Sequence, residues 1–155
     1  MEKLDQYTKM SKEINKIGIV VGGGFARGAA ELAFLKPVIE KIGYDKIAIL
    51  SGSSIGSLNC YAISCGTIDE LLNFYSDLDI DGIGSFIKAT RGRLYSKVFN
   101  RVEGNMKLLT YVNATRLATL DPYYFCLNSM KRSEIKNCIS SALGFPIMNK
   151  LKRFK

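Results

Sequence analysis

The sequence predicts an α/β fold whose core is a parallel sheet. Two short runs rich in β-branched and other apolar residues, 17–21 (IGIVV) and 46–50 (KIAIL), are typical of buried parallel strands. Each run is followed by a turn rich in small residues and then by a helical pattern. This order favours parallel strands joined by right-handed crossovers, with functional groups gathered at the carboxyl ends of the strands.

The first two helices follow these strands directly. Residues 28–42 repeat apolar side chains with a helical period, although Pro37 lies inside the pattern and is expected to kink or interrupt the helix. Gly43 is a suitable end for this helix. A second helix is predicted over 58–65, ended by Gly66.

The middle of the chain predicts one clear helix and then becomes hard to interpret. Residues 68–78 form a helical pattern, with Thr67 as the expected N-cap and Glu70 completing a capping box. Residues 79–104 are expected to form turns around a short helix at 85–89.

Two strands and a helix are predicted in the C-terminal third. The strands are 107–114 and 122–127, and the second begins with a proline, which a strand tolerates at its first position. The last helix is predicted over 134–143, with Gly144 after its end.

The composition suits one domain without a metal or other cofactor. The chain has 155 residues, 47% of them hydrophobic, and we divide it into a polar lead-in (1–16) and one domain (17–155). It contains no histidine, which excludes an imidazole base or a histidine metal ligand within the chain. The cysteines lack C-x-x-C spacing and are expected to be free thiols: Cys60, Cys65, Cys126 and Cys138.

The charge is basic, 22 − 14 = +8. Such a surplus suits an anionic lipid or a phosphorylated substrate, or it is simply a basic surface. Nucleic acid is not expected, because the basic residues are dispersed and lack an aromatic–basic motif. The N-terminus is polar and no apolar run reaches the ~18–20 residues of a membrane span. We therefore expect a cytoplasmic protein, either free or held peripherally on an anionic membrane.

The second turn matches a serine nucleophile motif. Residues Gly52 to Gly56 (GSSIG) fit G-x-S-x-G between a strand and a helix, the context that this motif requires. Ser54 would sit on a strained turn, flanking glycines would allow close approach, and the next helix would direct its dipole at the site. Ser53 and Ser57 lack paired glycines. The alternative is a turn of small residues without catalysis.

The first turn, residues 22–28 (GGGFARG), has several possible uses. Its backbone N–H groups could stabilise an oxyanion, or bind a phosphate at a helix N-terminus. The dinucleotide pattern G-x-G-x-x-G is not met because the third glycine falls one residue late, and the Walker pattern is absent. A tight packing turn remains an alternative.

Together the two turns resemble the patatin-like phospholipase family, in which G-G-G-x-[RK]-G forms the oxyanion hole and a G-x-S-x-G serine attacks an ester. Further similarity lies at 28–42, 111–115 and 140–146, so that it covers about residues 15–148. The resemblance implies a three-layer α/β fold with a parallel sheet, and a lipid or fatty-acyl ester as substrate.

The family's site residues can be transferred to this chain. Ser54 is then the nucleophile, and Gly52 and Gly56 flank it. Arg27 is the basic residue that braces the oxyanion loop. The members of that loop are Gly23, Gly24, Phe25, Arg27 and Gly28. The chain departs from the pattern at Phe25, which either replaces a glycine or adds one residue to the loop.

The resemblance also implies a serine–aspartate dyad, which agrees with the absence of histidine. The family's aspartate lies in an Asp-Gly-Gly or Asp-Gly-Ala motif after the segment that 140–146 resembles. Asp81-Gly82 is the only Asp-Gly here, and it comes too early, so we interpret it as a turn. The domain is therefore expected to be incomplete at its C-terminal end, and the chain alone nearly inactive, because losing a general base costs about 10²–10⁴-fold.

Two other functions remain open. One is a degenerate module that binds acyl chains or a partner protein without catalysis. The other is a phosphate- or nucleotide-binding α/β domain that uses residues 22–28.

Overall fold

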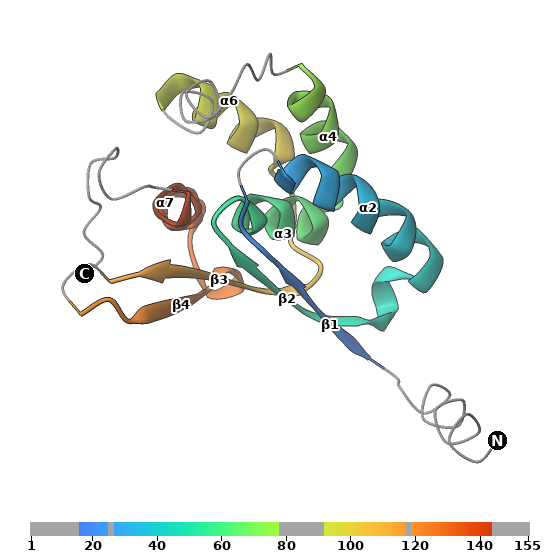
Figure 1. Cartoon of the computed structure of the whole chain (residues 1–155), viewed down its shortest axis with the longest axis horizontal. Coiled ribbons are helices and arrows are strands. Elements are labelled where there is room, and N and C mark those ends of the chain that lie inside the picture. The colour runs from blue at the N-terminus through green and yellow to red at the C-terminus, as the bar shows by residue number, and fades with distance from the viewer. Residues whose placement is uncertain (1–15, 25–26, 78–91, 117–118, 144–155) are drawn as a thin grey trace.

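The computed structural model describes residues 16–24, 27–77, 92–116 and 119–143 (Figure 1). The strands are β1 (Ile17–Val21), β2 (Ile47–Ser53), β3 (Leu109–Thr115) and β4 (Pro122–Cys126). The helices are α2 (Arg27–Ile42), α3 (Ile55–Cys65), α4 (Ile68–Ser76), α6 (Gly92–Val102) and α7 (Arg132–Ala142). Short 3-10 turns are η1 (Tyr44–Lys46) and η2 (Leu127–Ser129).

The four strands form one sheet in the order β1-β2-β3-β4. The first three are parallel, so the predicted α/β class is confirmed, whereas β4 runs antiparallel to β3. The physical reason is the short connection between them. Only six residues separate the two strands, and across this link the Arg116 N–H donates to the Asp121 carbonyl at 2.9 Å. A parallel crossover needs a dozen or more residues, so this link permits only an antiparallel hairpin.

The described helices all lie on one side of the sheet (Figure 1). In the centre, α3 packs on β2 and β3 and is itself covered by α2, α4, α6 and α7. Every residue of α3 is consequently buried. The turn that begins α3 therefore lies between the sheet and the surrounding helices, and both restrict its position.

The opposite face of the sheet is covered by none of the described helices (Figure 1). Side chains that share this face through the strand register are exposed: Val20 (81%), Ile49 (36%), Leu109 (41%) and Tyr124 (58%). Parallel sheets normally have both faces covered. The described residues thus supply two of the three layers expected from the sequence.

The helix boundaries agree with the sequence in part. Gly43 and Gly66 follow α2 and α3 with φ values of 89° and 74°, as their predicted role as helix ends requires. Pro37 does not interrupt α2, which continues from Arg27 to Ile42. The helix predicted from residue 58 begins at Ile55, because Ser51–Ser53 extend β2 and leave a turn of one residue.

The predicted capping box at the start of α4 is wrong. Thr67 precedes the helix, but its side chain makes no capping hydrogen bond. Its hydroxyl instead donates at 2.7 Å to the carbonyl of Val102, a residue 35 positions later in the chain. A tertiary partner has replaced the local one, which a short sequence window cannot reveal.

Helix α6 lies in a region, 79–104, where the sequence predicts turns around a short helix, so the prediction of turns is wrong over Gly92–Val102. This helix buries Tyr95, Val98, Phe99 and Val102 on one face, and the Phe99 ring stacks on Tyr61 with centroids 5.1 Å apart. The helical spacing is visible in hindsight, but glycines and arginines at its start favoured a turn. Residues 1–15 of the predicted lead-in (1–16), the predicted helix at 85–89 and Gly144 lie outside the described residues.

Candidate active site

Ser54 occupies the single residue between β2 and α3, in an unusual backbone conformation. Its φ is 52° and its ψ is −126°. A residue with a β-carbon is strained in such a region by about 1–3 kcal/mol, and such strain is concentrated at functional sites. The Ser54 side chain makes no capping hydrogen bond to α3, although the Ser57 N–H donates to the Ser54 carbonyl at 2.9 Å.

The glycines on either side of Ser54 are required by close backbone contacts. A β-carbon on Gly52 would lie 2.4 Å from the Gly56 carbonyl oxygen. One on Gly56 would lie 2.4 Å from the carbonyl oxygens of both Val21 and Gly22. The end of β1, the end of β2 and the first turn of α3 therefore converge at a distance that only glycine permits.

The neighbouring hydroxyl groups differ from that of Ser54. Ser57 is fully buried, and its Oγ donates to the Gly52 carbonyl at 3.2 Å, which ties the helix back to the strand. Ser53 is the last residue of β2 and pairs with Asn113 of β3.

The glycine-rich loop after β1 lies directly against Ser54. A β-carbon on Gly23 would be 3.0 Å from Ser54 Cβ and 3.7 Å from Ser54 Oγ. The serine turn and the glycine-rich loop thus meet at one point, as the common edge of parallel strands predicts.

The rest of the loop leads into α2. The Arg27 N–H donates to the Gly24 carbonyl at 3.1 Å, and Gly24 has a φ of 155°. Gly28 is buried, and a β-carbon there would lie 2.6 Å from Ile55 Cγ2, so the start of α2 is pressed against the start of α3. Phe25 lies outside the described residues.

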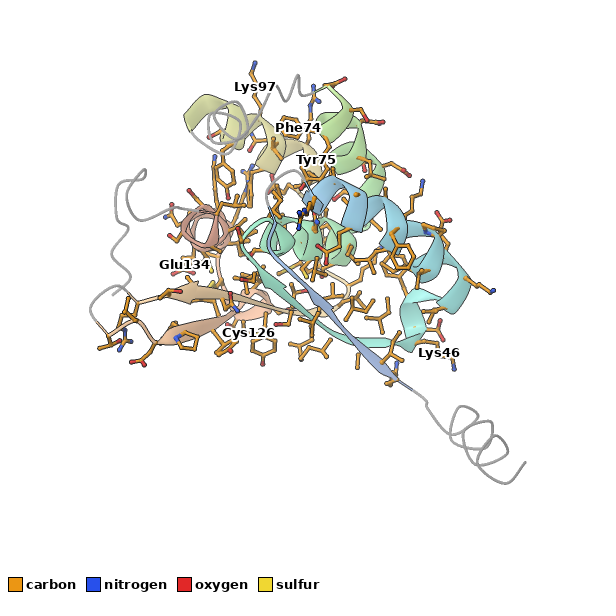
Figure 2. The ribbon with its side chains drawn as sticks, in the orientation of Figure 1. Lys46, Phe74, Tyr75, Lys97, Cys126 and Glu134 are labelled. Carbon is orange, nitrogen blue, oxygen red and sulfur yellow. The ribbon has the colours of Figure 1, made fainter. Side chains whose placement is uncertain are left out.

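Two groups of polar contacts at this site were not anticipated. Glu31 of α2 accepts a hydrogen bond from the Gly22 N–H at 3.0 Å through its Oε1. Asn59 of α3 contacts the Gly28 carbonyl and also the hydroxyl of Tyr75, which is labelled in Figure 2. The available signal was an asparagine in an otherwise apolar helix (LNCYAISC), because a polar side chain there needs partners.

The four cysteines are free thiols, and two of them are deeply buried. None of the four is in a disulfide, in agreement with the predicted free thiols. Burial raises the pKa of Cys60, and it raises the pKa of Cys138 to about 12, so both stay protonated at neutral pH. Among the described residues, no cluster of three or more Cys, Asp or Glu side chains could hold a metal ion.

We expect glycine at position 54 to stabilise the protein even though it removes the hydroxyl. Glycine would release strain of about 1–3 kcal/mol at the observed φ and ψ, less about 0.5–1 kcal/mol of added chain entropy. Ser54→Gly should therefore raise the free energy of unfolding by about 1 kcal/mol in urea titrations. Ser54→Ala keeps the β-carbon and should change it by less than about 0.5 kcal/mol. If Ser54→Gly is instead less stable than Ser54→Ala by the entropy cost of about 0.5–1 kcal/mol, this turn carries no strain.

A scan against protein families gives a match that spans the site. The family described as patatin-like phospholipase matches residues 19–137, from β1 into α7, and includes both turns. The chain belongs to the patatin-like phospholipase family. In this patatin-like chain, Ser54 lies within the matched region.

A solved structure is similar to this patatin-like chain over much of its length. The crystal structure of VipD from Legionella pneumophila aligns with 90% of this chain, at 11% sequence identity and a TM-score of 0.49. The alignment covers 44% of the VipD chain, so the present sequence spans less than half of that relative. A search of curated proteins found no significant match. None of the helices in the described residues is both long and apolar enough to cross a membrane.

Proposed function

We propose that this chain carries the nucleophile and the oxyanion loop of a serine lipid acyl hydrolase. The observation that supports this most strongly is Ser54, held at a strained turn between β2 and α3 with Gly23 of the loop against its side chain. In the G-x-S-x-G motif the nucleophilic serine lies on a sharp turn with a strained backbone, and Ser54 has such a backbone in a chain of this family.

The proposed reaction is hydrolysis of a lipid carboxylic ester. Ser54 Oγ attacks the carbonyl carbon, and the negative charge on the carbonyl oxygen is stabilised by backbone N–H groups of the loop and by the N-terminus of α3. The alcohol leaves with a proton and an acyl group remains on Ser54. Water then attacks the acyl-enzyme, releases the fatty acid and restores the serine hydroxyl. The site residues in this proposal are Ser54, Gly52, Gly56 and the loop members Gly23, Gly24, Phe25, Arg27 and Gly28.

The proton acceptor in this proposal is an aspartate, as in the family's dyad. Asp81 is outside the described residues and comes too early in the order of elements. We therefore propose that the 155 residues alone are nearly inactive and that an acid from elsewhere completes the dyad. Loss of a general base costs about 10²–10⁴-fold in rate.

The test compares the 155-residue chain with the full product of its gene. Each is assayed on a fluorogenic phospholipid and a short p-nitrophenyl ester, as wild type and as Ser54→Ala. Ser76→Ala, which alters an exposed serine on α4, is the matched control. We expect hydrolysis only by the full gene product, lost in Ser54→Ala and retained in Ser76→Ala. Activity of the short chain that depends on Ser54 would refute the missing acid, and activity in Ser54→Ala would refute the nucleophile.

A non-catalytic module is the second candidate, and the departure at Phe25, which replaces a glycine or adds one residue to the loop, favours it. Fatty-acid binding without ester hydrolysis by any form would support it. The phosphate-binding candidate is disfavoured at Gly22, because the Gly22 N–H already donates to the Glu31 carboxylate and is not free to bind a phosphate. Peripheral contact of the basic chain with an anionic membrane remains part of the proposal, and sedimentation with anionic against neutral vesicles tests it.

A further inference from the structure

Asn59 is a buried polar residue on the helix that follows Ser54. Its side chain is fully buried, and both ends of its amide have partners. The Nδ2 donates to the Gly28 carbonyl at 2.9 Å, and the Oδ1 accepts from the Tyr75 hydroxyl at 2.8 Å. A buried amide without partners would cost about 1–3 kcal/mol per unsatisfied group, so the pairing fixes the orientation of the side chain.

The hydrogen bond to the Gly28 carbonyl matters because Gly28 is the last residue of the glycine-rich loop. Gly28 also belongs to the first turn of α2. The contact with Asn59 thus joins the end of the loop to α3, the helix that begins one residue after Ser54. The packing of Gly28 on Ile55 sets how closely α2 and α3 approach. The hydrogen bond from Asn59 also fixes how the two helices are oriented relative to each other.

Tyr75 supplies the partner for the other end of the amide, from a third helix. The Gly28 carbonyl can only accept, so Nδ2 must face it, and the Tyr75 hydroxyl then donates to Oδ1. Tyr75 is itself buried, and burial raises its pKa, so that it remains a donor at any physiological pH. The three helices α2, α3 and α4 therefore meet at one fully paired side chain.

We infer that Asn59 is a positioning residue that sets the distance between the oxyanion loop and the Ser54 hydroxyl. The inference rests on the proposed function. The Asn59 side chain lies behind the loop and touches no substrate in this proposal. Its contribution is geometric, because a displacement of about 1 Å between reacting groups can cost about 10²-fold in rate.

The inference predicts a loss of kcat with little change in KM. In the full gene product, Asn59→Leu removes both hydrogen bonds while keeping a side chain of similar size. We expect kcat on the p-nitrophenyl ester to fall by about 10- to 100-fold, with KM within about threefold of wild type. Labelling of Ser54 by a fluorophosphonate should slow by a similar factor. Tyr75→Phe, which removes only the hydrogen bond to Oδ1, should give a smaller fall in the same direction.

The matched control is Ser64→Ala, at the other end of the same helix. Ser64 is also fully buried, and its Oγ donates to the Leu108 carbonyl at 3.0 Å. This variant should lower the melting temperature as Asn59→Leu does but leave kcat unchanged. If Asn59→Leu and Tyr75→Phe lower the melting temperature and leave kcat and labelling unchanged, Asn59 is merely structural and the inference is wrong.

Two other outcomes are also decisive. If Asn59→Leu does not fold, Tyr75→Phe alone decides, and unchanged kcat and labelling in that variant overturn the inference. If the wild-type gene product neither hydrolyses esters nor is labelled at Ser54, the proposed function has failed and the inference falls with it. That result differs from an active wild type with insensitive variants, in which only the role of Asn59 is refuted.

Discussion

Replacing Gly56 with alanine is expected to destabilise this protein by about 3 kcal/mol or more, which lies at the upper end of the range for overpacking. The new β-carbon would lie 2.4 Å from two backbone carbonyl oxygens, those of Val21 and Gly22. Backbone at the end of β1 cannot retreat without disturbing its pairing with β2, in which Val21 is the partner of Gly52. A side chain could change rotamer, whereas these atoms have no such freedom.

The size of this effect can be measured by urea and thermal unfolding. For a chain of this length, 3 kcal/mol corresponds to a fall of roughly 6–12 °C in the melting temperature. Gly22→Ala is the matched control, because its β-carbon would meet only Glu31 Oε1, at 3.9 Å. We expect Gly22→Ala to change stability by less than about 0.5–1 kcal/mol. Similar stabilities of Gly56→Ala and Gly22→Ala would mean that the close approach of β1 and α3 is absent.

The second large effect is a loss of stability at alkaline pH. Burial raises the pKa of Cys60, Tyr61, Tyr75 and Tyr95, and raises that of Cys138 to about 12. In the unfolded chain these groups ionise near their ordinary values, 9 for cysteine and 10 for tyrosine. Above pH 9 the unfolded state therefore loses protons that the folded state retains, and the free energy of unfolding must fall as the pH rises.

The slope of this fall is set by the number of groups that the fold keeps protonated. Each contributes up to about 1.4 kcal/mol per pH unit. Cys60 and Tyr75, both deeply buried, should together contribute about 3 kcal/mol per unit above pH 10. Urea unfolding at intervals from pH 7 to 11 measures the slope. Tyr75→Phe should reduce it by about 1 kcal/mol per unit between pH 10 and 11, and an unchanged slope in that variant would contradict burial of the Tyr75 hydroxyl.

Several features of the fold could be predicted because their causes are local. The β-branched runs before each turn became β1 and β2, and the glycines at 43 and 66 ended helices, since a positive φ is a property of one residue. The G-x-S-x-G pattern could be placed between a strand and a helix for the same reason. The residue types that such a turn needs lie within five consecutive positions.

Other features depend on partners far away in the chain. The direction of β4 follows from a short hairpin packed on β3, and Thr67 bonds to Val102 and not to its own helix. The face of α6 is recognisable only when Tyr61 is present to stack on Phe99. Propensity and capping patterns are weak in such cases, because tertiary contacts of similar energy override them.

In the candidate site, too, the features with local causes could be predicted and those that depend on distant partners could not. Residue pattern alone was enough to indicate the family, the serine turn and the glycine-rich loop, because backbone geometry at sharp turns restricts the residue types that can occupy them. It could not indicate that Glu31 bonds to Gly22, or that Asn59 and Tyr75 connect the loop to the serine helix. Those contacts join residues up to 31 positions apart, and burial makes their pairing obligatory only once three helices have packed together.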